Sequence, residues 1–250
     1  MSADEHATAM PSLRMRRRAA ATREILDAAE QHITENGPAA LSLRTVARNL
    51  GMTVQALYHY FPNRDALVTA LITKAYGDLA DAVQAAVDAA PEEPGVPRLV
   101  AAAEGYRRWA VAHPELYQLL YGTPLRYYSA PIDGPTTQAM TRISAIFQRE
   151  LFGGFTAAQL AAAETAPVSA SLQEYLDNLP QNNLKELPAA AVAMLMSAWG
   201  HMHGLVVLEV FGHTSFLGDH QAEIFRTAMC DMLADIHRRI PAQVGGSAVG

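Results

Sequence analysis

Apolar residues recur every three or four positions along most of this chain, a pattern that is typical of α-helices. The recurrence predicts a series of helices over residues 17–36, 43–50, 54–60, 64–89, 97–112, 114–121, 136–152, 188–212 and 219–240. The stretch 156–187 is interrupted by prolines and indicates one or two short helices. No strand-like alternation of any length is present, so the sequence predicts an all-α fold.

Two of the first helices are short and lie next to each other in the sequence. The first of them ends at Gly51 after about two turns, and the second is closed by Pro62. Ser42 and Thr53 precede the two helices and are residue types that cap helix N-termini. Two short helices that meet at Gly51-Met52 have the anatomy of a helix-turn-helix, the motif that places its second helix in the major groove of DNA.

The polar residues of this segment suit a nucleic-acid surface. Side chains that can donate to phosphates or base edges are Arg44, Arg48, Thr53, Gln55, Tyr58, His59, Tyr60 and Arg64. The net charge of the chain is −6, but residues 1–75 hold nine Arg and Lys against seven Asp and Glu, and the remainder hold ten against eighteen. Contact with a polyanion is therefore expected from the front of the chain. The alternative is a small three-helix packing unit with an ordinary polar face.

Several stretches in the first third carry a family resemblance. Residues 22–29, Gly37, residues 43–47 and residues 51–67 together resemble the TetR family of repressors. The resemblance covers roughly residues 18–70. It implies a helix-turn-helix DNA-binding domain over 18–65 and a larger helical ligand-binding and dimerisation domain over 66–240. We expect the segment 1–17 to be a disordered basic arm, with Arg14 and Arg16 to Arg18, and 241–250 to be a disordered tail.

The resemblance also implies roles for individual residues and partners for the whole chain. Thr53, Tyr58, His59 and Arg64 occupy positions that usually touch phosphates, and Val54, Gln55 and Ala56 sit where base contacts are usual. Val54 stands where the family commonly has Lys or Pro, and Tyr60 stands where His is frequent. The implied partners are a palindromic double-stranded DNA operator, a second copy of the chain, and a small-molecule effector that releases the repressor from DNA.

The last two long helices carry candidates for a dimer interface. Ala198 to Glu209 is similar to a C-terminal subtype of the family that carries Trp, His and Gly, here Trp199, His203 and Gly204. The helix predicted over 188–212 carries a stripe of small residues: Ala193, Ser197, Gly200 and Gly204. The helix predicted over 219–240 carries a stripe of apolar residues: Phe225, Met229, Leu233, Ile236 and Ile240. Two such helices from each subunit would form an intersubunit four-helix bundle. The alternative is that both stripes belong to the core of a single chain.

Aromatic and methionine side chains of the middle helices are candidates for an effector site that suits a mostly apolar molecule. They are Trp109, Tyr117, Tyr121, Tyr127, Tyr128, Phe147, Met194, Trp199, Met202 and His203. Core packing is the alternative for each of them, and for His203 it is a buried imidazole beneath the Trp199 indole. An enclosed cavity above roughly 300 Å³ would favour a small-molecule effector. A filled core would favour a regulator that is controlled by a protein partner.

Several other functions are not supported by the sequence. Cys230 is a single cysteine, so no intrachain disulfide or multi-cysteine metal site is expected. No nucleophile elbow, phosphate loop or metal-spacing motif is present, so we expect no enzyme, no cofactor and no metal. The segment from Leu187 to Leu208 is uncharged and long enough for a bilayer. It contains Pro188 and has no basic flank, so we interpret it as a buried helix of a cytoplasmic protein without a signal peptide.

Overall fold

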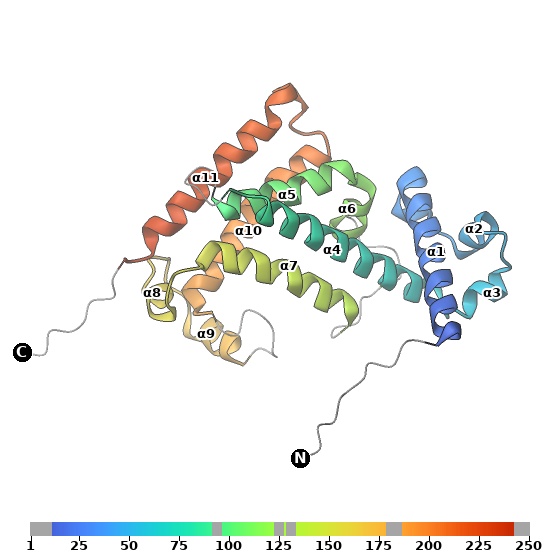
Figure 1. Cartoon of the computed structure of the whole chain (residues 1–250). Coiled ribbons are helices and arrows are strands. Elements are labelled where there is room, and N and C mark those ends of the chain that lie inside the picture. The colour runs from blue at the N-terminus through green and yellow to red at the C-terminus, as the bar shows by residue number, and fades with distance from the viewer. Residues whose placement is uncertain (1–11, 92–96, 123–127, 129–133, 179–186, 243–250) are drawn as a thin grey trace, which may run out of the picture.

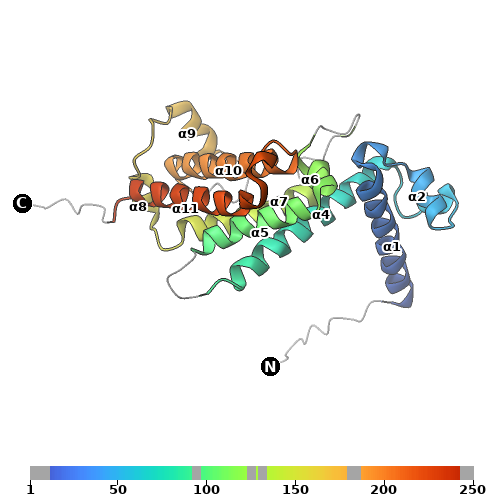
Figure 2. The ribbon, with the colours of Figure 1, turned by 90° about the horizontal axis from the view of Figure 1, so that it is seen from above.

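The computed structural model describes residues 12–91, 97–122, 128, 134–178 and 187–242. These residues form helices and turns without any strand, which confirms the all-α fold. Figures 1 and 2 show a small N-terminal group of helices beside a larger helical body, with α4 running from one into the other. The α-helices are α1 (Leu13–Asn36), α2 (Leu43–Asn49), α3 (Val54–Tyr58), α4 (Arg64–Asp88), α5 (Arg98–Ala112), α6 (Pro114–Tyr121), α7 (Pro135–Phe152), α8 (Ala157–Ala161), α9 (Ala170–Asp177), α10 (Ala189–Val210) and α11 (Gln221–Arg239).

Helices α1, α2 and α3 pack together at one end of the continuous hydrophobic core. Ile25, Ile33, Val46 and Leu57 are fully buried in it. Gly37 ends α1 with a φ of +78°, a conformation that glycine adopts without steric cost. The short 3-10 helix η1 (Pro38–Ala40) then leads into α2. These features form the expected helix-turn-helix arrangement.

Helix α1 begins earlier than the sequence predicts. Its N-cap is Ser12, whose hydroxyl accepts a hydrogen bond from the Met15 amide at 3.3 Å. The expectation of a disordered arm over 1–17 is therefore wrong for residues 13–17, because a capped run of Arg, Met and Leu favours a helix. Residues 1–11 lie outside the described residues.

Hydrogen bonds also fix the segment that follows α11. The side-chain amide of Gln159 donates hydrogen bonds of 3.0 Å to the carbonyl oxygens of Pro241 and Ala242. The expected disordered tail over 241–250 therefore does not include its first two residues. Residues 243–250 lie outside the described residues.

In the larger body, α4 lies between α5 and α7, and α10 and α11 pack on the other side of α5 (Figures 1 and 2). Gly105 allows α5 to approach α4 closely, since a Cβ at this position would lie 2.7 Å from the Cβ of Ala86. The ambiguous stretch 156–187 contains α8 and α9 as two short helices. A second 3-10 helix, η2 (Ser215–His220), connects α10 to α11.

Helix α10 is the most apolar helix of the body. Among the described residues it is the one helix whose length and composition would allow a membrane span, and 39% of its most apolar window is buried. Met194, Met202 and Val206 on α10 are packed into the same core as α5 and α11. The contacts of α10 are therefore those of a core helix, and its remaining face is exposed.

Candidate DNA-binding surface and effector site

Helix α3 presents most of the predicted DNA-binding side chains on the outside of the small domain. Thr53 caps the helix by accepting the Ala56 amide at 3.1 Å, and Leu57 anchors it in the core. Five of the predicted residues are exposed: Arg44, Thr53, Gln55, Tyr58 and His59. The structure therefore leaves these five side chains, from α2 to the turn after α3, accessible to a partner.

The four other predicted residues are half-buried and have structural contacts of their own. Val54 and Tyr60 pack partly against the hydrophobic core, and Ala56 is partly covered. The Nε of Arg64 donates to the Leu41 carbonyl oxygen at 3.5 Å. Arg64 therefore joins the start of α4 to the segment before α2, in addition to any contact with DNA.

Ion pairing divides the cationic residues by domain. None of the eight arginines from Arg14 to Arg64 forms an ion pair with a carboxylate in the described part of the chain. From Lys74 onward, every described Lys and Arg except Arg108 forms one. The positive charge of the small domain is therefore not neutralised within the protein, as expected for a surface that meets a polyanion.

A cluster of rings occupies the junction of α5, α6 and α10. The imidazole Nδ1 of His203 lies 2.9 Å from the Tyr106 hydroxyl and 3.0 Å from the Tyr117 hydroxyl. The His203 ring stacks on Trp199, and the ring of Tyr121 lies edge-on to His203 with centroids 4.7 Å apart. We name these five residues, Tyr106, Tyr117, Tyr121, Trp199 and His203, the ring cluster.

Burial shifts the protonation equilibria of the ring cluster in one direction, toward the neutral forms. Burial lowers the pKa of His203 below its ordinary value. Burial also raises the pKa of Tyr117 to about 12 and raises the pKa of both Tyr106 and Tyr121 further. At neutral pH the ring cluster is therefore an uncharged hydrogen-bonding network.

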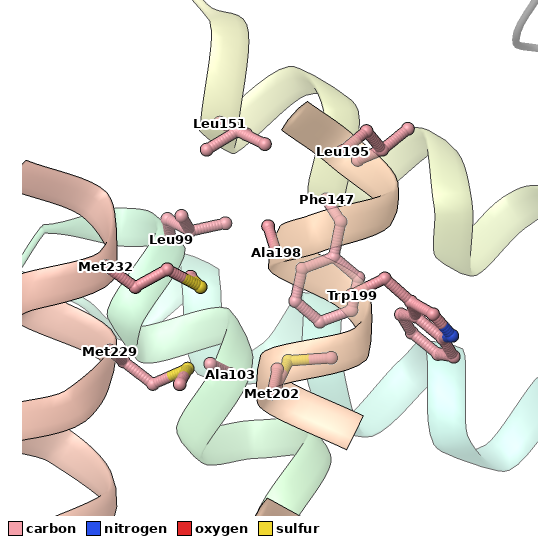
Figure 3. A pocket seen from close by; sticks show the side chains of 10 residues that line it. All are labelled: Leu99, Ala103, Phe147, Leu151, Leu195, Ala198, Trp199, Met202, Met229 and Met232. Atoms are coloured by element: carbon pink, nitrogen blue, oxygen red, sulfur yellow. The ribbon is translucent and has the colours of Figure 1, made fainter. Parts of the chain in front are cut away.

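A small apolar cavity adjoins the ring cluster (Figure 3). Its volume is about 30 Å³, and its lining residues are Leu99, Ala103, Phe147, Leu151, Leu195, Ala198, Trp199, Met202, Met229 and Met232. Trp199 belongs to both the cavity wall and the ring cluster, and Phe147 lies 6.2 Å from both the Trp199 and the Tyr106 ring centres. The described residues thus enclose a much smaller space here than the 300 Å³ that would indicate a preformed effector site.

The predicted effector residues fall into three groups. Phe147, Trp199 and Met202 line the cavity, and Tyr117, Tyr121 and His203 belong to the adjoining ring cluster. Of the remaining four, three lie elsewhere in the fold and one is outside the described residues. Trp109 packs against His113 with ring centroids 5.1 Å apart, and Met194 is buried without lining the cavity. The Tyr128 hydroxyl lies 3.1 Å from the Thr69 hydroxyl, away from the cavity lining, and Tyr127 lies outside the described residues.

Sequence reasoning missed several residues of this region. Tyr106 is fully buried at the centre of the ring cluster. Met229 and Met232 of α11 complete the cavity wall. Tyr106, Trp109 and His113 follow one another at helical spacing in the sequence. This spacing does not show which face of α5 is turned toward α10, so Tyr106 could not be assigned to the site.

The two predicted interface stripes have different environments. Ala193, Ser197 and Gly200 are exposed on α10, and a Cβ added at Gly200 or Gly204 would meet no atom within 4 Å. The stripe of α11 is instead buried in its own chain, which is the intrachain-core alternative for this stripe. Phe225, Met229, Leu233 and Ile236 are at most 6% exposed because α11 turns this face toward α5 and α10.

The fold and the charge distribution together define a class of protein. A helix-turn-helix whose arginines form no ion pairs, followed by a larger helical domain, is the architecture of a transcriptional regulator that binds DNA.

Comparisons with known proteins identify the family. Residues 25–71 match the family described as bacterial regulatory proteins, tetR family, and residues 99–232 match the tetracyclin repressor-like C-terminal domain. The HTH-type transcriptional regulator Rv1816 of Mycobacterium tuberculosis is 32% identical over 194 residues, which cover 76% of this chain and 80% of that protein. The chain belongs to the TetR family, so it is a DNA-binding transcriptional regulator and not an enzyme.

Solved structures agree with this assignment. The crystal structure of the regulatory protein SCO4313 is 31% identical and has a TM-score of 0.69, covering 90% of this chain and 100% of that chain. A protein from Rhodococcus sp. RHA1 shares the fold with a TM-score of 0.61 at 23% identity, covering 93% of this chain and 99% of that chain.

Proposed function

We propose that the chain is a homodimeric cytoplasmic repressor that binds a palindromic operator and is released by a small, mostly apolar molecule. The observation that carries this proposal is the position of Trp199, which forms one wall of the apolar cavity and stacks on His203 of the ring cluster. A molecule that enters the cavity would displace Trp199 and disturb the hydrogen bonds behind it.

The cavity walls indicate the chemistry of the effector. Its lining residues are aliphatic, aromatic or methionine side chains, which suit a hydrocarbon or aromatic group. Met202, Met229 and Met232 are unbranched and flexible, so they can change rotamers to enlarge the space. Behind Trp199, the neutral hydroxyls and imidazole of the ring cluster offer one hydrogen-bonding end. A phenol or an alkanol combines these two properties.

A series of contacts leads from the ring cluster to the DNA-binding domain. Tyr121 of α6 packs edge-on against Tyr76 of α4, with ring centroids 5.8 Å apart. Further along α4, the Lys74 ammonium lies 2.6 Å from the Glu30 carboxylate of α1. Effector binding would then bias α4 between two positions and change the separation of the two DNA-binding domains in the dimer.

The proposed dimer interface is the exposed face of α10. Ala193, Ser197, Gly200 and Gly204 form a stripe of small residues along it, and Phe211 at its end is 46% exposed. Small residues allow a second helix backbone to approach closely. A second copy of α10 would cover the part of this apolar helix that its own chain leaves exposed.

On the operator, α3 would lie in the major groove. Thr53, Tyr58, His59 and Arg64 are proposed to contact phosphates, and Arg44 and Tyr60 flank them. Gln55, with Val54 and Ala56, is proposed to face the base edges. Gln55 is exposed and can form a bidentate contact with adenine, and Val54 can meet a thymine methyl group.

A second candidate is a DNA-binding regulator without a small-molecule effector, controlled by a protein partner. The observation that favours it is the cavity volume of about 30 Å³, which is far below the roughly 300 Å³ of a pocket that holds a small-molecule ligand. In this case the ring cluster is a structural junction between α5, α6 and α10.

Release from DNA separates the two candidates. A labelled duplex obtained by selection from random sequences is bound to the full-length protein and titrated with a panel of phenols and straight-chain alkanols. The first candidate predicts that members of the panel release the duplex from the wild type but not from Ala198→Leu, which fills the cavity. Retention of the duplex with every member of the panel, at concentrations up to their solubility, would contradict the proposed effector chemistry.

A further inference from the structure

We propose that the start of α1 forms a second contact with DNA, in which Arg14 and Arg17 hold the sugar-phosphate backbone of one strand beside α3. Residues 13–18 precede the segment 25–71 that matches the family's DNA-binding domain. The inference rests on the proposed role of α3 as the recognition helix and is independent of any effector.

An open groove of about 720 Å³ separates the start of α1 from the end of α3. Arg14, Arg17 and Arg18 line one side of it, and they share a face of α1 because they are three and four positions apart. The other side carries His59 and Tyr60, with Met52 and Ala56 beside them. The groove thus reaches His59, which follows α3 and is one of the residues proposed to contact phosphates.

Arg18 fixes α1 relative to the end of α3. Its Nη2 donates to the His59 carbonyl oxygen at 2.9 Å, and its guanidinium carbon lies 5.4 Å from the centre of the Tyr60 ring. Arg18 is therefore a positioning residue. Arg14 and Arg17 precede Arg18 on α1, and the side chains of both are exposed.

The uncompensated positive charge of this segment favours contact with an external anion. Residues 12–23 contain five arginines and no carboxylate, and none of these arginines forms an ion pair within the described residues. Cations near a helix N-terminus are also disfavoured by the helix dipole, whose positive end lies there. Phosphates in the groove would neutralise the arginines and interact favourably with the dipole. Such contacts are independent of base sequence.

The salt dependence of DNA binding measures this contact directly. Full-length protein is titrated against a random-sequence duplex over a series of KCl concentrations, and the slope of log K against log[KCl] is determined. Arg14→Gln and Arg17→Gln are each expected to reduce the slope by about 0.9, the effect of one lost phosphate contact. Arg14→Lys and Arg17→Lys should retain the slope, because the charge remains.

Arg16→Gln is the matched control, because it removes one charge from the same turn of α1 but does not line the groove. It is expected to change the slope by less than half as much, and circular dichroism should show equal helix content in all variants. An unchanged slope in the Arg14→Gln/Arg17→Gln double variant, or an equal effect of Arg16→Gln, would overturn the inference. If Tyr58→Ala still weakened binding in that case, the role of α3 would stand. A wild type without salt-dependent binding would overturn both.

Discussion

The imidazole of His203 lies nearly parallel to the indole of Trp199, with 5.3 Å between the ring centroids and 14° between the planes. The two residues are four positions apart on α10 and therefore share a face. The same imidazole reaches the hydroxyls of Tyr106 on α5 and Tyr117 on α6. One stacked pair thus joins three helices, and Trp199 is also one of the residues that line the apolar cavity (Figure 3).

His203 should make the stability of the protein depend on pH. Because burial lowers the pKa of His203 in the native state, the unfolded chain binds a proton at a higher pH than the native chain. The contribution of neutral His203 is fully present above its unfolded pKa of about 6.5 and is lost as the pH falls toward the lowered value. Urea unfolding of the wild type should therefore show a steeper loss of stability with acidification than that of His203→Gln. Equal slopes in the two proteins would contradict this.

The ion pair between Arg107 and Glu209 should be far more sensitive to mutation than the surface pairs. Arg107 donates to both carboxylate oxygens of Glu209, and the side chains are only 14% and 10% exposed. Removing the carboxylate leaves a buried guanidinium unpaired, so Glu209→Ala should lower the free energy of unfolding by about 3–5 kcal/mol.

The control for this prediction is Asp81→Ala, which breaks an exposed pair with Arg142. Exposed pairs contribute at most about 1 kcal/mol, so the control should remain close to the wild type in chemical denaturation. A Glu209→Ala variant as stable as Asp81→Ala would show that the buried pair does not hold α5 against α10.

Gly200→Leu should disrupt the dimer while leaving the protomer folded. A side chain at Gly200 meets no atom of its own chain within 4 Å, so it causes no overpacking inside the protomer. In the proposed interface the leucine side chain would destabilise the dimer by about 1–3 kcal/mol through overpacking. Two-fold symmetry places one such side chain on each subunit, so the interface contains two of them. Light scattering after size-exclusion chromatography should show monomers, whereas Gly77→Leu on α4, which is equally free of close atoms, should remain dimeric. A stable, DNA-competent Gly200→Leu dimer would refute the interface.

Two residues of α3 should affect DNA binding in different ways. Tyr58→Ala removes a proposed phosphate contact and should weaken binding to all duplexes about equally. Gln55→Ala removes a proposed base contact and should relax the preference at one base pair by about 1–3 kcal/mol. Competition binding with operator variants distinguishes these outcomes. Loss of sequence preference in Tyr58→Ala, with none in Gln55→Ala, would reverse the proposed roles.

The helices were predictable from sequence because their signals are local. The periodicity of apolar residues, the capping residues and the helix-breaking prolines and glycines placed α4, α5, α6 and α7 within one or two residues of their observed bounds. The start of α1 was not predictable from charge alone, because Ser12 caps a basic run that otherwise resembles a solvated arm.

The sites were less predictable because they depend on packing between helices. The stripes of α10 and α11 have equivalent periodicity, yet the structure exposes Gly200 and buries Met229. Periodicity shows that a face is apolar but cannot show whether its own chain covers it. Trp199 and His203 were singled out because residues 198–209 resemble a C-terminal subtype of the family, whereas Tyr106 required knowledge of which face of α5 meets α10.

Selection of bound sequences from a pool of random duplexes tests the central claim most directly. A two-fold dimer that reads DNA with α3 should enrich a palindromic sequence whose half-site centres lie one helical turn apart, about 34–36 Å. Gln55→Ala should enrich a sequence altered at symmetric positions of both half-sites. Enrichment of a single unrepeated half-site, or no enrichment over the starting pool, would contradict a dimeric regulator that recognises its operator through α3.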